Sequence, residues 1–132
     1  MRRFSILACA IVVLSLAACT NPREELAERG ATPYTEAEVR ALISGKTERW
    51  SNGAAYYGPD GALVATWKGQ DYTGTWSTTE AGEACQHVAT WSLVPCTTYF
   101  HDGDMLTWMY KRQLHTVSIE ETYMDGNHVS YF

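Results

Sequence analysis

The chain is predicted to be mainly β. We expect an antiparallel meander of about seven or eight strands that forms a small barrel or a strongly curved sheet, with one short N-terminal α-helix. Two observations indicate this fold: apolar and polar residues alternate with period two after residue 46, and Asn-Gly or Asp-Gly turn signals recur about every ten residues. The helix is indicated by a single capping motif with an apolar stripe behind it.

The chain begins with the features of a bacterial export signal. Arg2 and Arg3 precede an uncharged apolar run, and small residues then lead to a cysteine in the sequence Leu16-Ala17-Ala18-Cys19. This pattern resembles a lipobox, which implies removal of residues 1–18 and attachment of acyl chains to Cys19. Several acyl chains bind a membrane far more firmly than one. The alternative is an ordinary secretory peptide cut near Ala18.

The residue after Cys19 bears on the location. Thr20 stands where Asp is associated with retention at the inner membrane of enteric bacteria. The sequence therefore predicts a lipid-anchored protein of the cell envelope, at the outer membrane and facing the periplasm. Residues 19–33 are expected to be the lipidated cysteine and a flexible tether, because Leu26 is their only large apolar residue. Asn21 and Pro22 could still cap a short helix there.

The domain itself is predicted to span residues 34–132. It opens with the capping box Thr35-Glu36-Ala37-Glu38, followed by Val39, Leu42 and Ile43 on one helical face and Gly45 at the expected end. After this helix, aromatic and β-branched residues alternate with polar ones, as half-buried antiparallel strands require. The expected inward-facing sets are Leu63, Ala65 and Trp67; Tyr72, Gly74 and Trp76; Leu106, Trp108 and Tyr110; and Val117, Ile119 and Tyr123.

Two of the four cysteines are left for the folded domain. Cys9 is removed with the signal peptide and Cys19 is expected to receive lipid, so Cys85 and Cys96 remain in a compartment where disulfides persist. A Cys85–Cys96 disulfide is the simplest interpretation. A two-cysteine metal site is the alternative, and it would need two further ligands nearby.

Charge and side-chain chemistry exclude several function classes. The formal net charge of −5, with no basic cluster, makes nucleic acid a poor partner. The four histidines include no HxH or HExxH pair, and Glu120 and Glu121, expected as neighbours in one strand, would point to opposite faces. No nucleophile elbow is present. We therefore expect no catalytic residues, no metal, no cofactor and no enzymatic activity. The histidines are His87, His101, His115 and His128.

The set of motifs resembles small exported bacterial proteins grouped as domain of unknown function 995. The likeness rests on the lipobox, TEAEVRALISGKT, YYGPDG, GTW and the late cysteine pair, and it extends from Thr35 to Asp104. The resemblance implies the fold and the export described above. It implies no activity and no catalytic residues. The apolar segment VATWSLVP between the cysteines departs from a simple hairpin turn.

The function expected from the sequence is a non-enzymatic binding or envelope-interaction module. Trp91, in the loop between the cysteines, is the first candidate for a binding surface, although a loop folded back on the core explains it equally well. Tyr56 and Tyr57 face opposite ways in one strand, so one of them is a second candidate. Two alternatives are a small barrel that holds an apolar ligand and an inhibitor similar to the lipoprotein inhibitors of lysozyme. The expected partners are the membrane, through the lipid, and an envelope protein or a small apolar ligand.

Overall fold

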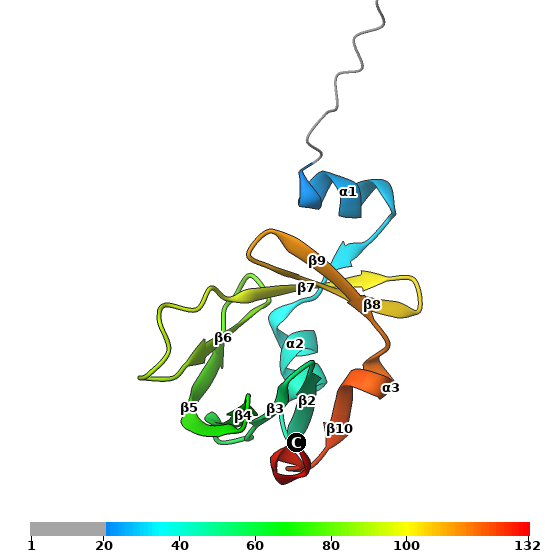
Figure 1. Ribbon diagram of the computed structural model, residues 1–132. Coiled ribbons are helices and arrows are strands. Elements are labelled where there is room, and N and C mark those ends of the chain that lie inside the picture. The colour runs from blue at the N-terminus through cyan, green and yellow to red at the C-terminus, as the bar shows by residue number, and fades with distance from the viewer. Residues whose placement is uncertain (1–20) are drawn as a thin grey trace, which may run out of the picture.

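The computed structural model describes residues 21–132, so the predicted signal peptide and Cys19 lie outside the described residues. In this part of the chain, one antiparallel sheet curls into a half-barrel (Figure 1). Its strands are β1 (Thr32–Pro33), β2 (Lys46–Trp50), β3 (Gly53–Tyr57), β4 (Ala62–Trp67), β5 (Gln70–Thr78), β6 (Glu83–His87), β7 (Thr97–Asp102), β8 (Met105–Tyr110), β9 (Gln113–Val117) and β10 (Tyr123–Asp125). The helices are α1 (Pro22–Glu28), α2 (Glu36–Ile43), α3 (Ile119–Thr122) and the 3-10 turn η1 (Val129–Tyr131).

The strand order is a meander with one rearrangement at its edge. Strands β2 to β9 pair with their sequence neighbours, while β10 returns to pair with β2, and β1 adds to the edge of β7 beyond β6. The sheet is therefore open between β9 and β10, which makes it a half-barrel and not a closed barrel. The predicted curved antiparallel meander is confirmed. The count is ten strands and not seven or eight, because β1 and β10 are too short for their alternation to be read.

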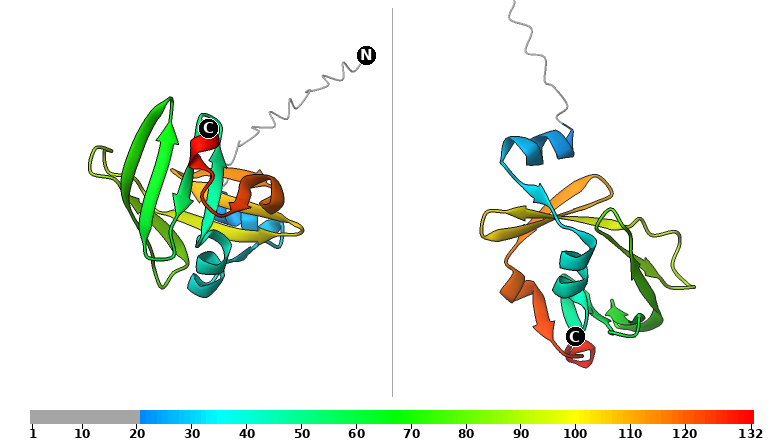
Figure 2. Two further views of the ribbon diagram at one scale, coloured as in Figure 1. Left: turned by 90° about the horizontal axis from the view of Figure 1, so that it is seen from below. Right: turned by 180° about the vertical axis from the view of Figure 1, so that it is seen from behind.

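Helix α2 forms at the predicted position and fills one end of the curled sheet. Thr35 and Glu38 form the reciprocal capping box, in which the backbone N–H of Thr35 donates to Glu38 Oε2 at 2.8 Å. The predicted stripe is buried, with Val39 and Ile43 fully inaccessible. The helix packs on β2, β5 and β6, as the views from below and behind show (Figure 2). Gly45 ends the helix at φ +73° and donates its N–H to the carbonyl of Tyr57.

The core lies between α2 and the concave face of the sheet. Aromatic and aliphatic side chains from seven strands meet the α2 stripe there, and Trp76 donates its indole N–H to the Gly58 carbonyl at 2.8 Å. The core residues are Tyr34, Val39, Leu42, Ile43, Ala55, Tyr57, Leu63, Ala65, Trp76, Ala84, Val88, Tyr99, Leu106 and Tyr123.

The segment expected to be a free tether is packed against the domain. Asn21 caps α1 by accepting from the Arg23 N–H, and Leu26 is only 1% exposed. The Arg29 guanidinium lies 3.0 Å from the Asp102 carboxylate, and β1 then pairs with β7. The expectation that nothing holds residues 21–33 is therefore wrong, because one buried leucine, an ion pair and a strand pairing fix them.

The stretch from Val117 to Tyr123 is not the single strand that alternation predicted. Residues Ile119–Thr122 form α3, so Glu120 and Glu121 lie exposed on a helical turn. The chain must turn here because β9 pairs with β8 at one open edge of the sheet and β10 pairs with β2 at the other. Within residues 21–132 no helix has the length and apolar character needed to cross a bilayer.

Candidate functional site

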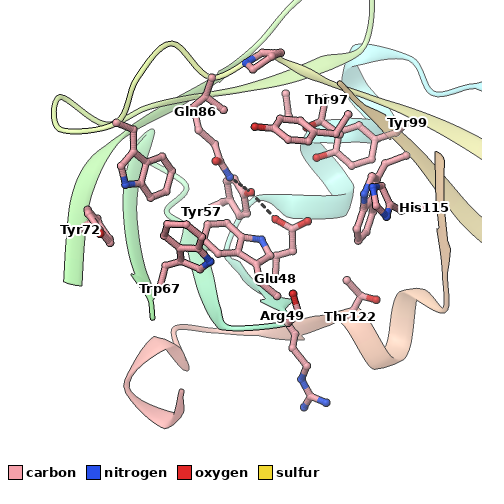
Figure 3. Close-up of a pocket in the computed structure, with 18 of the residues that line it drawn as sticks. Glu48, Arg49, Tyr57, Trp67, Tyr72, Gln86, Thr97, Tyr99, His115 and Thr122 are labelled. Atoms are coloured by element: carbon pink, nitrogen blue, oxygen red, sulfur yellow. Dashed lines mark hydrogen bonds between the residues drawn. The ribbon is translucent and has the colours of Figure 1, made fainter. Parts of the chain in front are cut away.

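The end of the half-barrel opposite α2 contains a pocket of about 950 Å³ (Figure 3). Its walls come from both arms of the curled sheet and from the loop between β6 and β7. Four tryptophans and four tyrosines are among the lining residues. These rings are Trp50, Trp67, Trp91, Trp108, Tyr57, Tyr72, Tyr99 and Tyr110.

Three of the rings form a continuous wall. Trp91 lies with its ring centroid 6.2 Å from that of Trp50 and 5.2 Å from that of Tyr72, and both pairs are tilted. Such tilted contacts are the arrangement that aromatic quadrupoles favour. Trp108 stands against His115 in another part of the pocket, with centroids 6.0 Å apart. The pocket therefore offers ring faces from more than one direction.

The register of the sheet places Glu48 on the same face as the pocket residue Tyr72. Register places Tyr123, Glu48, Ala55, Ala65 and Tyr72 opposite one another across β10, β2, β3, β4 and β5. Residues paired in this way share a face of the sheet. Ala55 and Ala65, both buried in the core, therefore lie between Glu48 and Tyr72 across the sheet.

Glu48 is the one acidic side chain that lines the pocket, and it is buried, with 7% exposed. Its Oε2 accepts from the Tyr57 hydroxyl at 2.6 Å, and its Oε1 accepts from the Tyr123 hydroxyl at 3.4 Å. Tyr57 in turn accepts from the Gln86 amide at 2.5 Å. Burial raises the pKa of the Glu48 carboxyl above its usual range, and the hydrogen bonds from Tyr57, Trp50 and Tyr123 oppose that rise.

Of the three residues predicted to form a binding surface, two line the pocket and one lies outside it. Trp91 is half-buried in the pocket wall, so it is both folded back and exposed to the hollow. Tyr57 is 2% exposed and reaches the pocket through its hydroxyl. Tyr56 is half-buried and, as expected for the neighbour of Tyr57, lies on the opposite face of β3. The structure therefore brings Trp91 and Tyr57 to one site and leaves Tyr56 outside it.

The Cys85–Cys96 disulfide is present, with Cα atoms 4.3 Å apart. It joins the two ends of the loop that contains Trp91. Five loop residues line the pocket, whereas Leu93 points outward and is fully exposed. The disulfide thus fixes one rim of the pocket. The lining loop residues are Thr90, Trp91, Ser92, Val94 and Pro95.

The four histidines are dispersed. His101 stacks on Tyr34 with centroids 3.8 Å apart and lies 3.2 Å from Glu38 Oε1, while His115 lines the pocket. His87 is near Ser77, and His128 stacks on Tyr131. In the part of the chain that the structure describes, no group of three His, Cys, Asp or Glu side chains is placed to hold a metal ion.

Sequence reasoning missed Glu48 and Gln86. A signal for Glu48 was present, since alternation along Lys46–Trp50 places the carboxylate on the same strand face as Trp50. The contact between Glu48 and Tyr123 joins residues 75 positions apart, so local sequence patterns do not predict it.

The sequence profile of the family described as "Protein of unknown function (DUF995)" matches residues 10–114. The chain belongs to the DUF995 family. The matched region includes α1, α2, every strand through β8 and the first two residues of β9, so Glu48, Tyr57, Gln86 and Trp91 all fall within the DUF995 region. Tyr123 and the rest of β10 lie beyond it. No curated protein and no solved structure was found to match this chain.

Proposed function

We propose that this DUF995 protein is a non-enzymatic binding module of the cell envelope that takes a small, largely apolar molecule into the half-barrel. The observation that supports this proposal best is the pocket of about 950 Å³ lined by eight aromatic side chains. Ligand pockets in proteins commonly have volumes of ~300–1,000 Å³, with mostly apolar walls and a few converging polar groups. Glu48, Tyr57 and Gln86 are such a polar group here.

Binding is proposed and not catalysis, because of what surrounds the carboxylate. Among residues 21–132 the hydrogen-bond network of Glu48 consists of tyrosine hydroxyls, the Trp50 indole and the Gln86 amide, with neither a histidine nor a serine or cysteine in it. Nucleophilic catalysis by a serine or cysteine requires a general base within hydrogen-bond reach of that nucleophile, and this network holds no such pair. The buried network is suited to orienting a ligand.

The location is part of the same proposal. Lipid on Cys19 would hold the protein at the outer membrane facing the periplasm, with only the few residues before α1 between the lipid and the domain. The domain would then lie close to the membrane surface, where apolar and amphipathic molecules concentrate.

The neutral fluorophore N-phenyl-1-naphthylamine tests the binding proposal. We expect saturable quenching of tryptophan fluorescence in the purified domain, because four tryptophans line the pocket. Trp91→Ala should weaken binding by roughly tenfold, since the ring forms part of the wall. Tyr56→Ala is the matched control, an aromatic truncation outside the pocket, and should leave the affinity unchanged. Absence of saturable binding, or equal effects of the two substitutions, would contradict the proposal.

A further inference from the structure

Glu48 has hydrogen-bonding capacity that the protein leaves unused. A carboxylate has about four lone-pair sites. Oε2 accepts a short bond from Tyr57, but the bond from Tyr123 to Oε1 is 3.4 Å, longer than a good O–H to O contact. With the Trp50 indole as its third donor, the carboxylate still has an acceptor position to offer. It belongs to a side chain that lines the pocket.

The network around Glu48 is arranged to present an acceptor. Gln86 donates to the Tyr57 oxygen, so the Tyr57 proton is directed to Glu48 (Figure 3). Both hydrogen bonds in this series are donated in the direction of the Glu48 carboxylate. A group that joins it at Oε1 must therefore be a hydrogen-bond donor or a cation.

The carboxylate has no basic partner in the described residues. No lysine, arginine or histidine nitrogen lies within 4.0 Å of Glu48 in that part of the chain, whereas four other carboxylates form such ion pairs. Arg49 is among the lining residues, but its side chain points away from Glu48 and its guanidinium stacks over the Phe132 ring at 5.5 Å (Figure 3). A buried carboxylate without a counter-charge is costly.

The walls of the pocket suit a cation. The faces of Trp and Tyr rings attract ammonium groups, most strongly where water is excluded. Trp50, two residues from Glu48 on β2, belongs to the aromatic wall with Trp91 and Tyr72. The net charge of −5 attracts cations toward the protein as a whole.

These observations point to one class of ligand. We propose, on the basis of the binding function above, that the pocket takes a molecule with an apolar body and a cationic nitrogen, and that Glu48 and the surrounding rings bind that nitrogen. An alkylammonium or a protonated aromatic amine has this chemistry. Glu48 is then the counter-ion of the ligand, and the ligand's N–H or methylammonium face fills the position beside Oε1.

Binding of the cation is coupled to release of a proton from the Glu48 carboxyl group. Burial raises the pKa of Glu48, so the empty pocket takes up a proton at a pH where a solvated glutamate is ionised, and a bound cation releases it. The tyrosines around it remain neutral, because burial raises the pKa of Tyr57, Tyr99 and Tyr123 well above 10. The other charged or titratable groups nearby are Lys46 and Arg49 on β2 and His115 across the pocket.

Three probes with the same twelve-carbon chain test the inference. Dodecyltrimethylammonium, dodecanol and dodecanoate are titrated below their aggregation limits, with tryptophan fluorescence and calorimetry as readouts. We expect the ammonium to bind at least about tenfold more tightly than the alcohol, and dodecanoate to bind most weakly. Glu48→Gln should remove the preference for the cation while leaving dodecanol binding intact. Glu80→Gln, the same charge change on an exposed turn, is the control and should keep the preference.

A second readout does not depend on the fold of any variant. In the wild type, the affinity for dodecyltrimethylammonium should increase as pH rises through the titration of Glu48, while the affinity for dodecanol stays constant. Equal affinities of cation and alcohol, or a cation affinity independent of pH, would overturn the inference and leave the binding function standing. If none of the probes binds, both proposals fail.

Discussion

The two ends of the half-barrel are made from the same strands and differ in what fills them. At one end α2 inserts Val39 and Ile43, which are fully buried, between the strands. At the other end the side chains of β2, β4 and β5 surround a pocket of about 950 Å³. A small domain has little core to spare. The packed end therefore supplies stability, and the open end is available for binding.

The register of the sheet shows how one fold supports both ends. Tyr57, at the end of β3, contacts Trp76 edge-on in the core and also sends its hydroxyl to Glu48 in the pocket. The Tyr57 ring thus lies between the packed core and the pocket. These contacts hold the Glu48 carboxylate in one position, which would lower the ordering cost of the proposed binding.

The largest expected effect tests the packed end. Ile43→Ala should lower the free energy of unfolding by about 3 kcal/mol, because it removes a fully buried side chain and leaves a cavity. Trp91→Ala should cost only about 1 kcal/mol, since its ring already borders open space. Urea denaturation measures both. Ile43→Val, expected to cost about 1 kcal/mol, keeps the comparison measurable if the alanine variant fails to fold. Equal losses for Ile43→Ala and Trp91→Ala would show that the two ends do not differ in packing.

The disulfide gives the next largest effect, and it acts on the open end. Replacing Cys85 and Cys96 together by alanine should cost roughly 2–3 kcal/mol, because the bridge closes a loop of separation 11 and restricts the unfolded chain. It should also increase amide hydrogen exchange in residues 89–95 more than in α2. Adding a reductant to the wild type should reproduce both changes. A rim that stays protected without the disulfide would show that Trp91 packing alone holds the loop.

Local patterns in the sequence were enough to predict the packed end. The capping box from Thr35 to Glu38, the stripe ending at Ile43 and the burial of Leu63 and Ala65 each depend on a few neighbouring residues, and each forms as expected. Trp67, the third residue of the last set, is 40% exposed and lines the pocket. Such patterns reflect helix and strand geometry directly. They determine which side chains face inward.

The open end depends on contacts that local patterns do not encode. The sheet opens between β9 and β10 because α3 interrupts an apparently continuous strand. The β8–β9 hairpin turns at Lys111 and Arg112, which adopt φ of +49° and +64° although neither is glycine. Glu48 meets Tyr123 only after these turns are made. Alternation indicated the face on which Glu48 lies, but the pocket around it follows from the pairing of distant strands.

The smallest expected effect is a pH dependence of stability that originates at the boundary between the two ends. Because burial raises the pKa of Glu48 in the folded state, the folded protein binds this proton more tightly than the unfolded chain does. The contribution of Glu48 to stability is therefore fully present below its usual value of 4.5 and declines as pH rises toward the folded pKa, by at most about 1.4 kcal/mol per pH unit for one proton. Urea denaturation of the wild type and of Glu48→Gln across this range measures the difference.

The glutamine variant should lack this decline, whereas Glu80→Gln, which removes an exposed carboxylate, should keep it. Adding dodecyltrimethylammonium should flatten the wild-type profile, since a bound cation favours the ionised form of Glu48 in the folded state. Parallel profiles for the wild type and Glu48→Gln would mean that the carboxylate is as well solvated in the fold as in the unfolded chain. Water would then reach Glu48 freely in the folded protein. The proposed contrast between a desolvated carboxylate and the aromatic walls of the pocket would be wrong.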